Sequence, residues 1–361
     1  MFYHSILLLK KSNCVELNTD SLMKTYKTGK YVHIKKICNN RNHLEMLAID
    51  QRPPIFNIIK EKKKNYKFDD VVKFKKHISQ NLSEHSSAIL MDPIYSIPNL
   101  IPTSKSNGLI VTLEDHAFEE KGEGRYSKNI NNWTVEKIKK IGGDAVKVLA
   151  WYRPDADQNS IKHQKKYIET IGKQCEKYDI PFLLELLVYP FKNETGYSKD
   201  YKEQQNKNQN HVIESVKEFS KAKYKVDIFK LESPVVSNKL EDGKFTKATQ
   251  DAFKKLSLAT KDIPWVMLSS GMSKNSFYNC LKLAYKNGAS GYLAGRTIWL
   301  DAFKDYPNYK KITHNLSKES ANYVKKLNAL TKKNAQSLEK YLANKLIQKK
   351  SINFKNTYKG F

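Results

Sequence analysis

The sequence predicts an α/β fold, a (β/α)8 TIM barrel with helical extensions at both ends of the chain, and three observations favour it. Short apolar runs of strand length alternate with amphipathic segments of helical period. Eight such runs lie between residues 40 and 305, which is close to the ~250 residues typical of this barrel. Polar residues follow almost every run, as expected where strand ends converge on one mouth.

The strand–helix alternation predicts a parallel sheet with its helices outside. The expected strands cover residues 44–49, 87–91, 108–113, 143–150, 181–188, 226–231, 264–269 and 290–294. The expected helices between them include 133–141, 159–178, 209–222, 246–260 and 273–287. An open, doubly wound sheet is the alternative, but no Gly-x-Gly-x-x-Gly turn follows the first strand.

The predicted barrel spans residues 41–305, with an extension on each side. Residues 1–40 lack strong periodicity, so we expect an N-terminal extension that packs loosely on the barrel. Residues 306–361 are expected to form a basic, helical C-terminal extension. The segments 114–132 and 189–208 are long enough for loops that cover a site.

The chain is strongly basic, with 64 Lys and Arg against 37 Asp and Glu and a formal charge of +27. Such an excess can mark a nucleic-acid or anionic-membrane partner. Here the lysines are spread along the chain, and no nucleic-acid-binding motif is recognisable. We therefore expect no nucleic-acid partner, although a positive potential would attract a phosphorylated substrate.

Metal and membrane signals are weak. The four cysteines are far apart and form no Cys-x-x-Cys pair, which argues against a zinc site and a disulfide framework. No apolar run approaches the roughly 20 residues that span a bilayer. We expect a cytoplasmic protein without a bound metal or a membrane partner. A homo-oligomer is an open possibility, because no interface can be read from the sequence.

Three of the predicted strands carry a charged residue inside an apolar run, namely Lys147, Glu185 and Lys230. A buried charge costs several kcal/mol unless it is paired or neutralised. Side chains alternate between the two faces of a strand, so each of these residues shares a face with apolar neighbours. If those faces point inward, the three charges meet inside the barrel and line one polar cavity.

A lysine held among apolar walls beside a carboxylate suits imine chemistry on a carbonyl substrate. The pattern alone leaves Lys147 and Lys230 almost equal as the nucleophile. Glu185 fits either a general acid–base or an ion-pair partner of Lys147. Glu232 follows the same strand as Lys230 and is expected to be a structural partner.

An anion site is predicted where the last two strands end. Ser269, Ser270 and Gly271 close one strand and precede a helix, whose N-terminal N–H groups suit a phosphate. The next strand ends at Gly295 and Arg296, where glycine permits close approach and arginine can bind phosphate with two hydrogen bonds. Phosphate sites after strands seven and eight recur in this fold. The alternative is a tight turn and a surface charge.

Several of these motifs also resemble one enzyme family. The sequence resembles the class I tagatose-bisphosphate aldolases and the related sulfofructose-phosphate aldolases over about residues 44–302. The resemblance rests on 47–52 (LAIDQR), 144–147 (DAVK), 184–185 (LE), 227–232 (DIFKLE), 268–271 (LSSG) and 291–296 (GYLAGR). It implies a barrel enzyme that needs neither metal nor cofactor. Such an enzyme cleaves a phosphorylated ketose to dihydroxyacetone phosphate and an aldehyde.

The resemblance also implies roles for individual residues. The lysine at the position of Lys230 forms the imine, and the glutamate at the position of Glu185 transfers protons. Other matching positions line the substrate site, namely Asp50, Gln51, Arg52, Lys147, Ser270 and Arg296. Asp50 would hold hydroxyls or assist dehydration of the carbinolamine.

The chain departs from the family pattern in places. Pro53-Pro54 follows Arg52 where relatives carry other residues, so the first strand's mouth is expected to be reshaped. Residues 148–153 and 262–271 resemble the sulfofructose-phosphate branch, whereas 182–187 resembles the tagatose branch. These segments therefore leave the distal group of the substrate open between phosphate and sulfonate. The favoured substrate is similar to tagatose 1,6-bisphosphate, giving glyceraldehyde 3-phosphate as the aldehyde. The alternatives are a sulfofructose phosphate, or a non-catalytic barrel that binds polyanions or a regulatory partner.

Overall fold

The computed structural model describes residues 27–99, 107–198, 207–342 and 354–358. Eight parallel strands close into a barrel in the order β1-β10-β9-β8-β7-β6-β3-β2. They are β1 (Leu44–Ala48), β2 (Ala88–Met91), β3 (Gly108–Thr112), β6 (Ala145–Trp151), β7 (Phe182–Leu187), β8 (Ile228–Leu231), β9 (Trp265–Leu268) and β10 (Gly291–Ala294). Every strand predicted from the apolar runs is present, so the predicted fold class is confirmed.

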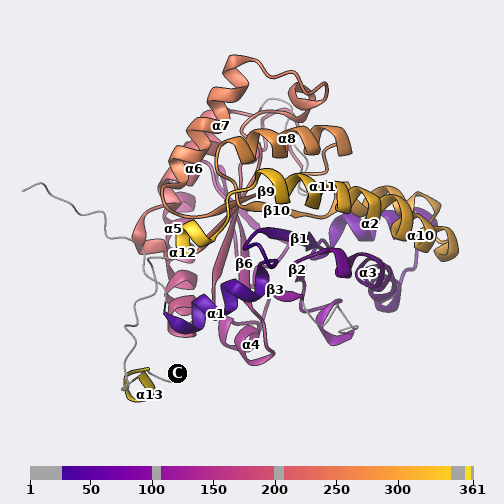
Figure 1. Cartoon of the computed structure of the whole chain (residues 1–361), viewed down its shortest axis with the longest axis horizontal. Coiled ribbons are helices and arrows are strands. Elements are labelled where there is room, and N and C mark those ends of the chain that lie inside the picture. The colour runs from indigo at the N-terminus through magenta and orange to yellow at the C-terminus, as the bar shows by residue number, and fades with distance from the viewer. Residues whose placement is uncertain (1–26, 100–106, 199–206, 343–353, 359–361) are drawn as a thin grey trace, which may run out of the picture.

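Helices surround the strands (Figure 1). Those that alternate with the strands are α2 (Pro53–Lys62), α3 (Phe68–Leu82), α4 (Val135–Lys140), α5 (Gln158–Lys177), α6 (Gln209–Phe219), α7 (Lys247–Thr260), α8 (Lys274–Lys286) and α9 (Arg296–Trp299). The remaining helices are α1 (Thr28–Ile37), α10 (Tyr309–Asn315), α11 (Ala321–Asn334), α12 (Glu339–Leu342) and α13 (Phe354–Thr357). None of the helices in the described part of the chain has the length and apolar character that crossing a bilayer requires.

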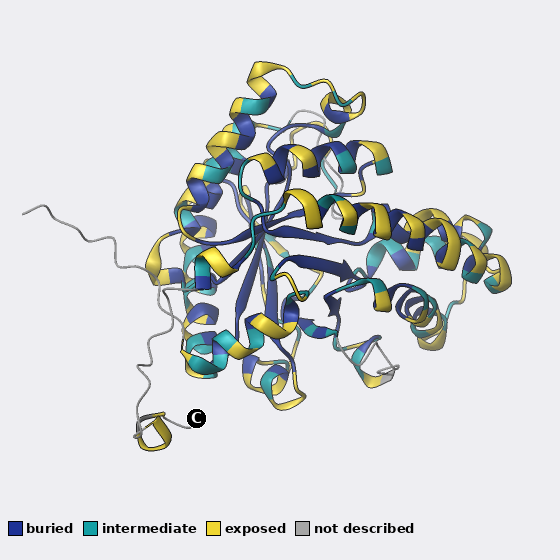
Figure 2. Cartoon of the chain, in the orientation of Figure 1, coloured by how far each residue is buried: buried dark blue, intermediate teal, exposed yellow. Residues whose placement is uncertain are grey.

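Alternate strand residues face two different cores, as the period of two predicts. Outward-facing residues such as Val146, Leu184 and Phe229 pack against the helices in the larger core. Inward-facing Ala145, Leu183 and Ile228 belong to a separate cluster inside the barrel. Figure 2 shows the result, with buried strands at the centre and exposed residues on the outer faces of the helices. On β6, β7 and β8 the next inward positions belong to Lys147, Glu185 and Lys230.

The amino-terminal end of the barrel is closed by the two extensions. Ile34 and Ile37 of α1 and Leu338 and Leu342 near α12 join the inward-facing cluster of the barrel. Lys30 of α1 is 2% exposed, and its ammonium lies 2.9 Å from the buried carboxylate of Asp227. The expectation of loose packing is therefore wrong for residues 28–37. Residues 1–26 lie outside the described part of the chain.

The two predicted covering loops lie at the other end. The first contains a hairpin of β4 (Glu119–Lys121) and β5 (Gly124–Tyr126). The second begins after β7, and residues 199–206 of it lie outside the described part. Arg125 of β5 joins the loops, because its guanidinium donates to the carbonyl oxygen of Ser198 at 2.7 Å. Of the predicted C-terminal helical extension, residues 309–334 are helical, with a π-helical turn at Leu316–Ser320.

Candidate active site

The three charged strand residues meet inside the carboxyl end of the barrel. The register of β7 and β8 places Glu185 directly opposite Lys230. Glu185 Oε1 lies 2.9 Å from Lys230 Nζ, and Glu185 Oε2 lies 2.8 Å from Lys147 Nζ. All three side chains are buried, with exposed fractions of 5% or less for the whole residues. The shared cavity predicted from the sequence is present.

Lys147 occupies the centre of a carboxylate cluster. Its ammonium lies 3.0 Å from Asp50, 2.5 Å from Glu114 and 2.8 Å from Glu185. Burial alone would lower the pKa of Lys147, but the three carboxylates overcome that effect and raise it well above its ordinary value. Lys147 is therefore held as an ammonium ion. Lys230 has a different environment, since among the described residues its one recorded ion pair is with Glu185.

The carboxylates around Lys147 differ in their protonation. Burial opposes ionisation of Asp50, but Lys147 and Lys230 outweigh it and hold the pKa of Asp50 far below its ordinary value. The same balance lowers the pKa of Glu185. For Glu114, burial outweighs the attraction of Lys147, so its pKa is raised. The cluster thus holds two carboxylates that favour the charged form and one that takes up a proton more readily.

Glu114 is a site residue that the sequence analysis did not select. It follows β3, is 3% exposed, and accepts a hydrogen bond from Thr112 Oγ1 at 2.6 Å. Its position after a strand was the available signal, but nothing in the sequence linked it to Lys147. Asp115 and His116 line the same pocket, with the His116 ring 3.0 Å from the Asp115 carboxylate.

The end of β1 contributes Asp50, Gln51 and Arg52 to the pocket, as predicted. Arg52 is 3% exposed, and its Nη2 donates to the backbone oxygen of Glu114 at 3.2 Å. Its Nε and Nη1 have no hydrogen-bond partner among the described residues, and neither has Gln51 Oε1. A buried donor without a partner costs about 1–3 kcal/mol, more when charged. Among the described residues, these groups therefore keep unused hydrogen-bonding capacity in the pocket.

The predicted anion-binding residues gather beside the lysine. Ser269, Ser270, Gly295 and Arg296 line one cavity together with Lys230 and Glu185. Gly271 has a φ of +80°, and a side chain there would lie 3.6 Å from the Arg296 guanidinium carbon. A side chain at Gly295 would come within 2.6 Å of the Ala48 carbonyl oxygen and 2.7 Å of Gln51 Nε2. Gly295 thus allows close approach of the backbone, whereas Gly271 is favoured by its left-handed conformation.

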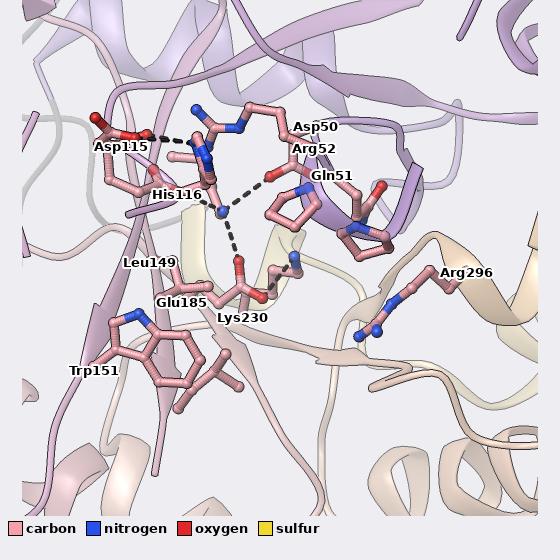
Figure 3. Close-up of a pocket in the computed structure, with 15 residues that line it drawn as sticks. Asp50, Gln51, Arg52, Asp115, His116, Leu149, Trp151, Glu185, Lys230 and Arg296 are labelled. Atoms are coloured by element: carbon pink, nitrogen blue, oxygen red, sulfur yellow. Dashed lines mark hydrogen bonds and ion pairs between the residues drawn. The ribbon is translucent and has the colours of Figure 1, made fainter. Parts of the chain in front are cut away.

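The pocket has two basic ends with the lysine–glutamate pair between them. Figure 3 shows Arg296 on one side of Lys230 and Glu185, and Arg52, Asp115 and His116 on the other. Leu149 and Trp151 of β6, with Leu187 of β7, supply an apolar wall. Within the described residues, no group of three or more His, Cys, Asp or Glu side chains is arranged to hold a metal ion.

Two further carboxylates, Glu232 and Asp92, follow strands and pair with lysines that do not line the pocket. Glu232 accepts a hydrogen bond from the Val188 N–H at 2.7 Å and pairs with Lys207 at 2.9 Å, as expected of a structural partner. Asp92, which follows β2, pairs with Lys75 of α3 behind the pocket.

A closed parallel barrel with a buried lysine and glutamate at its carboxyl end suits chemistry through a lysine amine, as in aldolases of class I. Residues 44–301 match the family model described as "DeoC/LacD family aldolase". The chain belongs to this family.

Curated relatives agree with this assignment. The chain is 32% identical over 285 residues to tagatose 1,6-diphosphate aldolase 1 of Enterococcus faecalis, covering 77% of this chain and 86% of that protein. It is 32% identical over 287 residues to tagatose 1,6-diphosphate aldolase of Listeria innocua, covering 77% and 83% of the two chains.

Solved structures agree on the fold. Fructose-bisphosphate aldolase from Plasmodium falciparum superposes with a TM-score of 0.63 at 10% identity, covering 85% of this chain and 95% of that one. The enzyme from Slackia heliotrinireducens superposes with a TM-score of 0.59 at 14% identity, covering 87% and 90%.

Proposed function

We propose that the protein cleaves a ketose bisphosphate similar to tagatose 1,6-bisphosphate to dihydroxyacetone phosphate and glyceraldehyde 3-phosphate, with Lys230 as the imine-forming residue. The single observation that carries the proposal is the pair of Lys230 and Glu185, 2.9 Å apart in a buried cavity. An amine nucleophile and an acid–base group must both reach the substrate, and this spacing allows it. The names of the curated relatives support the choice of substrate.

Lys230 is favoured over Lys147 as the nucleophile because an amine attacks a carbonyl only in its neutral form. Three carboxylates surround Lys147 and raise its pKa well above the ordinary value. That ammonium is suited to bind and polarise substrate oxygens. The choice between the two lysines, which the sequence pattern leaves almost even, is therefore supported by their different charge environments.

The proposed reaction begins when Lys230 Nζ attacks the ketone carbon and forms a carbinolamine. Loss of water, assisted by Asp50, gives the protonated imine. Glu185 then takes the proton of the hydroxyl on C4, the C3–C4 bond breaks, and its electron pair moves into the imine to form an enamine. The aldehyde leaves. A proton returned to C3 regenerates the imine, and water hydrolyses it to release dihydroxyacetone phosphate and the free amine.

The two basic ends of the pocket fit the two anionic ends of the substrate. The phosphate on the dihydroxyacetone half would bind at the ends of β9 and β10, to Ser269, Ser270, Gly271, Gly295 and Arg296. Arg52, which has two donor groups without a partner in the described part of the chain, would bind the distal anion. Gln51 would bind a hydroxyl between the two anions. A guanidinium accepts phosphate or sulfonate oxygens alike, so the same site admits a sulfofructose phosphate as the alternative substrate.

Borohydride trapping tests the nucleophile. With dihydroxyacetone phosphate present, reduction should attach the triose to the wild-type protein, and Lys230→Ala should remain unmodified by intact mass. Lys147→Met, which removes the competing amine, should still be labelled. Equal labelling of Lys230→Ala and wild type would refute the assignment of Lys230.

Two further measurements test the reaction itself. Turnover should survive EDTA, because no proposed step uses a metal. Initial rates with tagatose bisphosphate, fructose bisphosphate and sulfofructose phosphate should be highest for tagatose bisphosphate. A clear preference for the sulfonated ketose would replace the proposed substrate and leave the mechanism intact.

A further inference from the structure

We propose that Lys75 is a positioning residue that keeps Arg52 available for an anionic ligand. Lys75 belongs to α3 and lies behind the pocket, outside the residues that line it. The inference rests on the proposed function in one respect, because it takes Arg52 to be the group that binds the distal anion of the substrate. It assigns a role to a buried ion pair that the reaction does not use.

Lys75 and Asp92 form a fully buried ion pair, with side chains that are 2% and 0% exposed. Lys75 Nζ also donates to the backbone oxygen of Ile49 at 2.7 Å. Ile49 directly precedes Asp50, so the ammonium fixes the backbone where β1 enters the pocket. The backbone oxygen of Ala48, one residue earlier, accepts from Trp299 Nε1 at 3.1 Å. The end of β1 is therefore held at two successive carbonyl groups.

The carboxylate of Asp92 already accepts hydrogen bonds from four groups. Besides Lys75, its carboxylate accepts from the N–H groups of Ile94 at 2.9 Å and Tyr95 at 2.7 Å, and from Ser96 Oγ at 2.8 Å. A carboxylate that already accepts four hydrogen bonds has little capacity for a guanidinium as well.

Arg52 lies near this pair. β2, which leads to Asp92, lies between β1 and β3 in the barrel, and Arg52 reaches from the end of β1 to the backbone oxygen of Glu114 after β3. Burial lowers the pKa of Lys75, and the positive charge of Arg52 acts in the same direction. Arg52 nonetheless keeps Nε and Nη1 without a partner among the residues that the structure describes, at 3% exposure. A buried arginine is normally paired with a carboxylate. Here Lys75 takes the charge of Asp92, and Arg52 is left to face the pocket.

The role predicts what happens when Lys75 loses its charge. In Lys75→Met, Asp92 would be a buried carboxylate without a cation, and Arg52 is the nearby cation that can compensate it. Arg52 would then turn from the pocket toward Asp92. In Lys75→Met/Asp92→Asn no carboxylate remains to attract Arg52, so the guanidinium would face the pocket again.

The test is a double-mutant cycle on Lys75 and Asp92 with tagatose 1,6-bisphosphate. Lys75→Met should raise KM about tenfold or more, the order expected for a lost charge-assisted hydrogen bond, with kcat changed less than about threefold. Asp92→Asn and the double variant should both keep KM within about threefold of wild type. A double variant with the KM of Lys75→Met, or worse, would overturn the proposal.

The chain offers a matched control for general destabilisation. Lys30 and Asp227 form a second buried lysine–aspartate pair, 2.9 Å apart and equally inaccessible, at the opposite end of the barrel. Lys30→Met should lower the melting temperature as Lys75→Met does, without the rise in KM. If Lys75→Met does not fold, Asp92→Asn and the double variant decide alone, since a tenfold rise in KM in the double variant contradicts the role.

Calorimetric titration with inorganic phosphate separates this proposal from the proposed function. Arg52→Ala should lose part of the phosphate binding seen in wild type, and Lys75→Met should lose the same part. This result would support the role of Lys75 even if no ketose phosphate were turned over. Phosphate binding that is unchanged in Arg52→Ala or in Lys75→Met would overturn it.

Discussion

Glu185 contacts both lysines of the site, one with each carboxylate oxygen. A carboxylate in this position can stabilise Lys147, transfer protons at Lys230 and its substrate, or do both. The two roles are separable because Lys147 retains Asp50 and Glu114 when Glu185 is changed. A substitution that keeps shape but removes basicity therefore tests the acid–base role alone.

Glu185→Gln should reduce kcat about 10²- to 10⁴-fold, the usual contribution of a positioned acid–base group, while KM changes only a few-fold. Steady-state cleavage assays measure both constants. Glu232→Gln is the matched control, since Glu232 is equally buried but pairs with Lys207 on a loop. A near-normal kcat in Glu185→Gln would remove the acid–base role and leave Glu185 as an ion-pair partner.

The lowered pKa of Asp50 should make the free energy of unfolding depend on pH. Its pKa lies far below the ordinary value of about 3.9 because Lys147 and Lys230 outweigh the effect of burial. A depressed carboxylate pKa stabilises the folded state above the unfolded pKa, and this contribution disappears as the pH falls through the folded pKa. The free energy of unfolding of the wild type should therefore decrease between pH 5 and pH 3 by more than that of Asp50→Asn. The difference between the two decreases should be at least about 1 kcal/mol. Urea denaturation across this range measures the slopes, and equal slopes would contradict the prediction.

At the scale of elements, the buried Arg125 is one of the side chains that attach the β4–β5 hairpin to the barrel. The Arg125 guanidinium carbon lies 4.1 Å from the ring centre of Phe118, 4.6 Å from Trp151, 4.7 Å from Tyr189 and 5.8 Å from Tyr197. Burial lowers the pKa of Arg125 to about 10. Trp151 also lines the pocket, so the hairpin and the apolar wall share this contact.

Arg125→Leu should loosen the hairpin, because each contact of a cation with an aromatic ring contributes about 0.5–2 kcal/mol. Trypsin should then cleave after Lys121 faster than in wild type, and KM should rise. Lys128→Leu is the control, since its ion pair with Glu119 is exposed and contributes little. Unchanged cleavage after Lys121 would show that other contacts hold the hairpin.

The sequence predicted the strands better than it predicted the side-chain contacts between residues that are distant in the chain. The period of two placed Lys147, Glu185 and Lys230 on inward faces, and the barrel topology then brought them together. Glu114 was missed because its contact with Lys147 joins residues 33 positions apart, and no local pattern encodes that pairing. Helix α1 was expected to belong to a loosely packed extension because residues 1–40 lack strong periodicity. Lys30 is in fact buried against Asp227, nearly 200 residues away in the chain.

At the scale of the whole molecule, the two ends of the barrel have different tasks. The amino-terminal end is filled by apolar residues and closed by both extensions. The carboxyl-terminal end holds the buried charges and their pocket. This is the division usual for the fold, where one face provides stability and the other provides chemistry. Stability and chemistry both depend on closure of the sheet between its first and last strands, β1 and β10.

Gly291 permits that closure. It begins β10 and pairs with Leu44 of β1, and a side chain at this position would lie 1.8 Å from the Leu44 carbonyl oxygen. Gly291→Ala must separate the two strands, so it should lower the free energy of unfolding by about 3 kcal/mol or more. Because β1 leads to Asp50 and Gln51, kcat/KM should fall as well.

Gly288→Ala separates crowding from backbone strain. Gly288 has a φ of +89°, but a side chain there would meet no atom within 4 Å. That variant should cost only the about 1–2 kcal/mol of a left-handed conformation and retain full activity. Urea denaturation of the two variants gives the comparison. If both lost the same free energy and both remained active, contact between β1 and β10 at Gly291 would not limit closure of the barrel, and the geometry of the site would have to be secured by the remaining strand pairs.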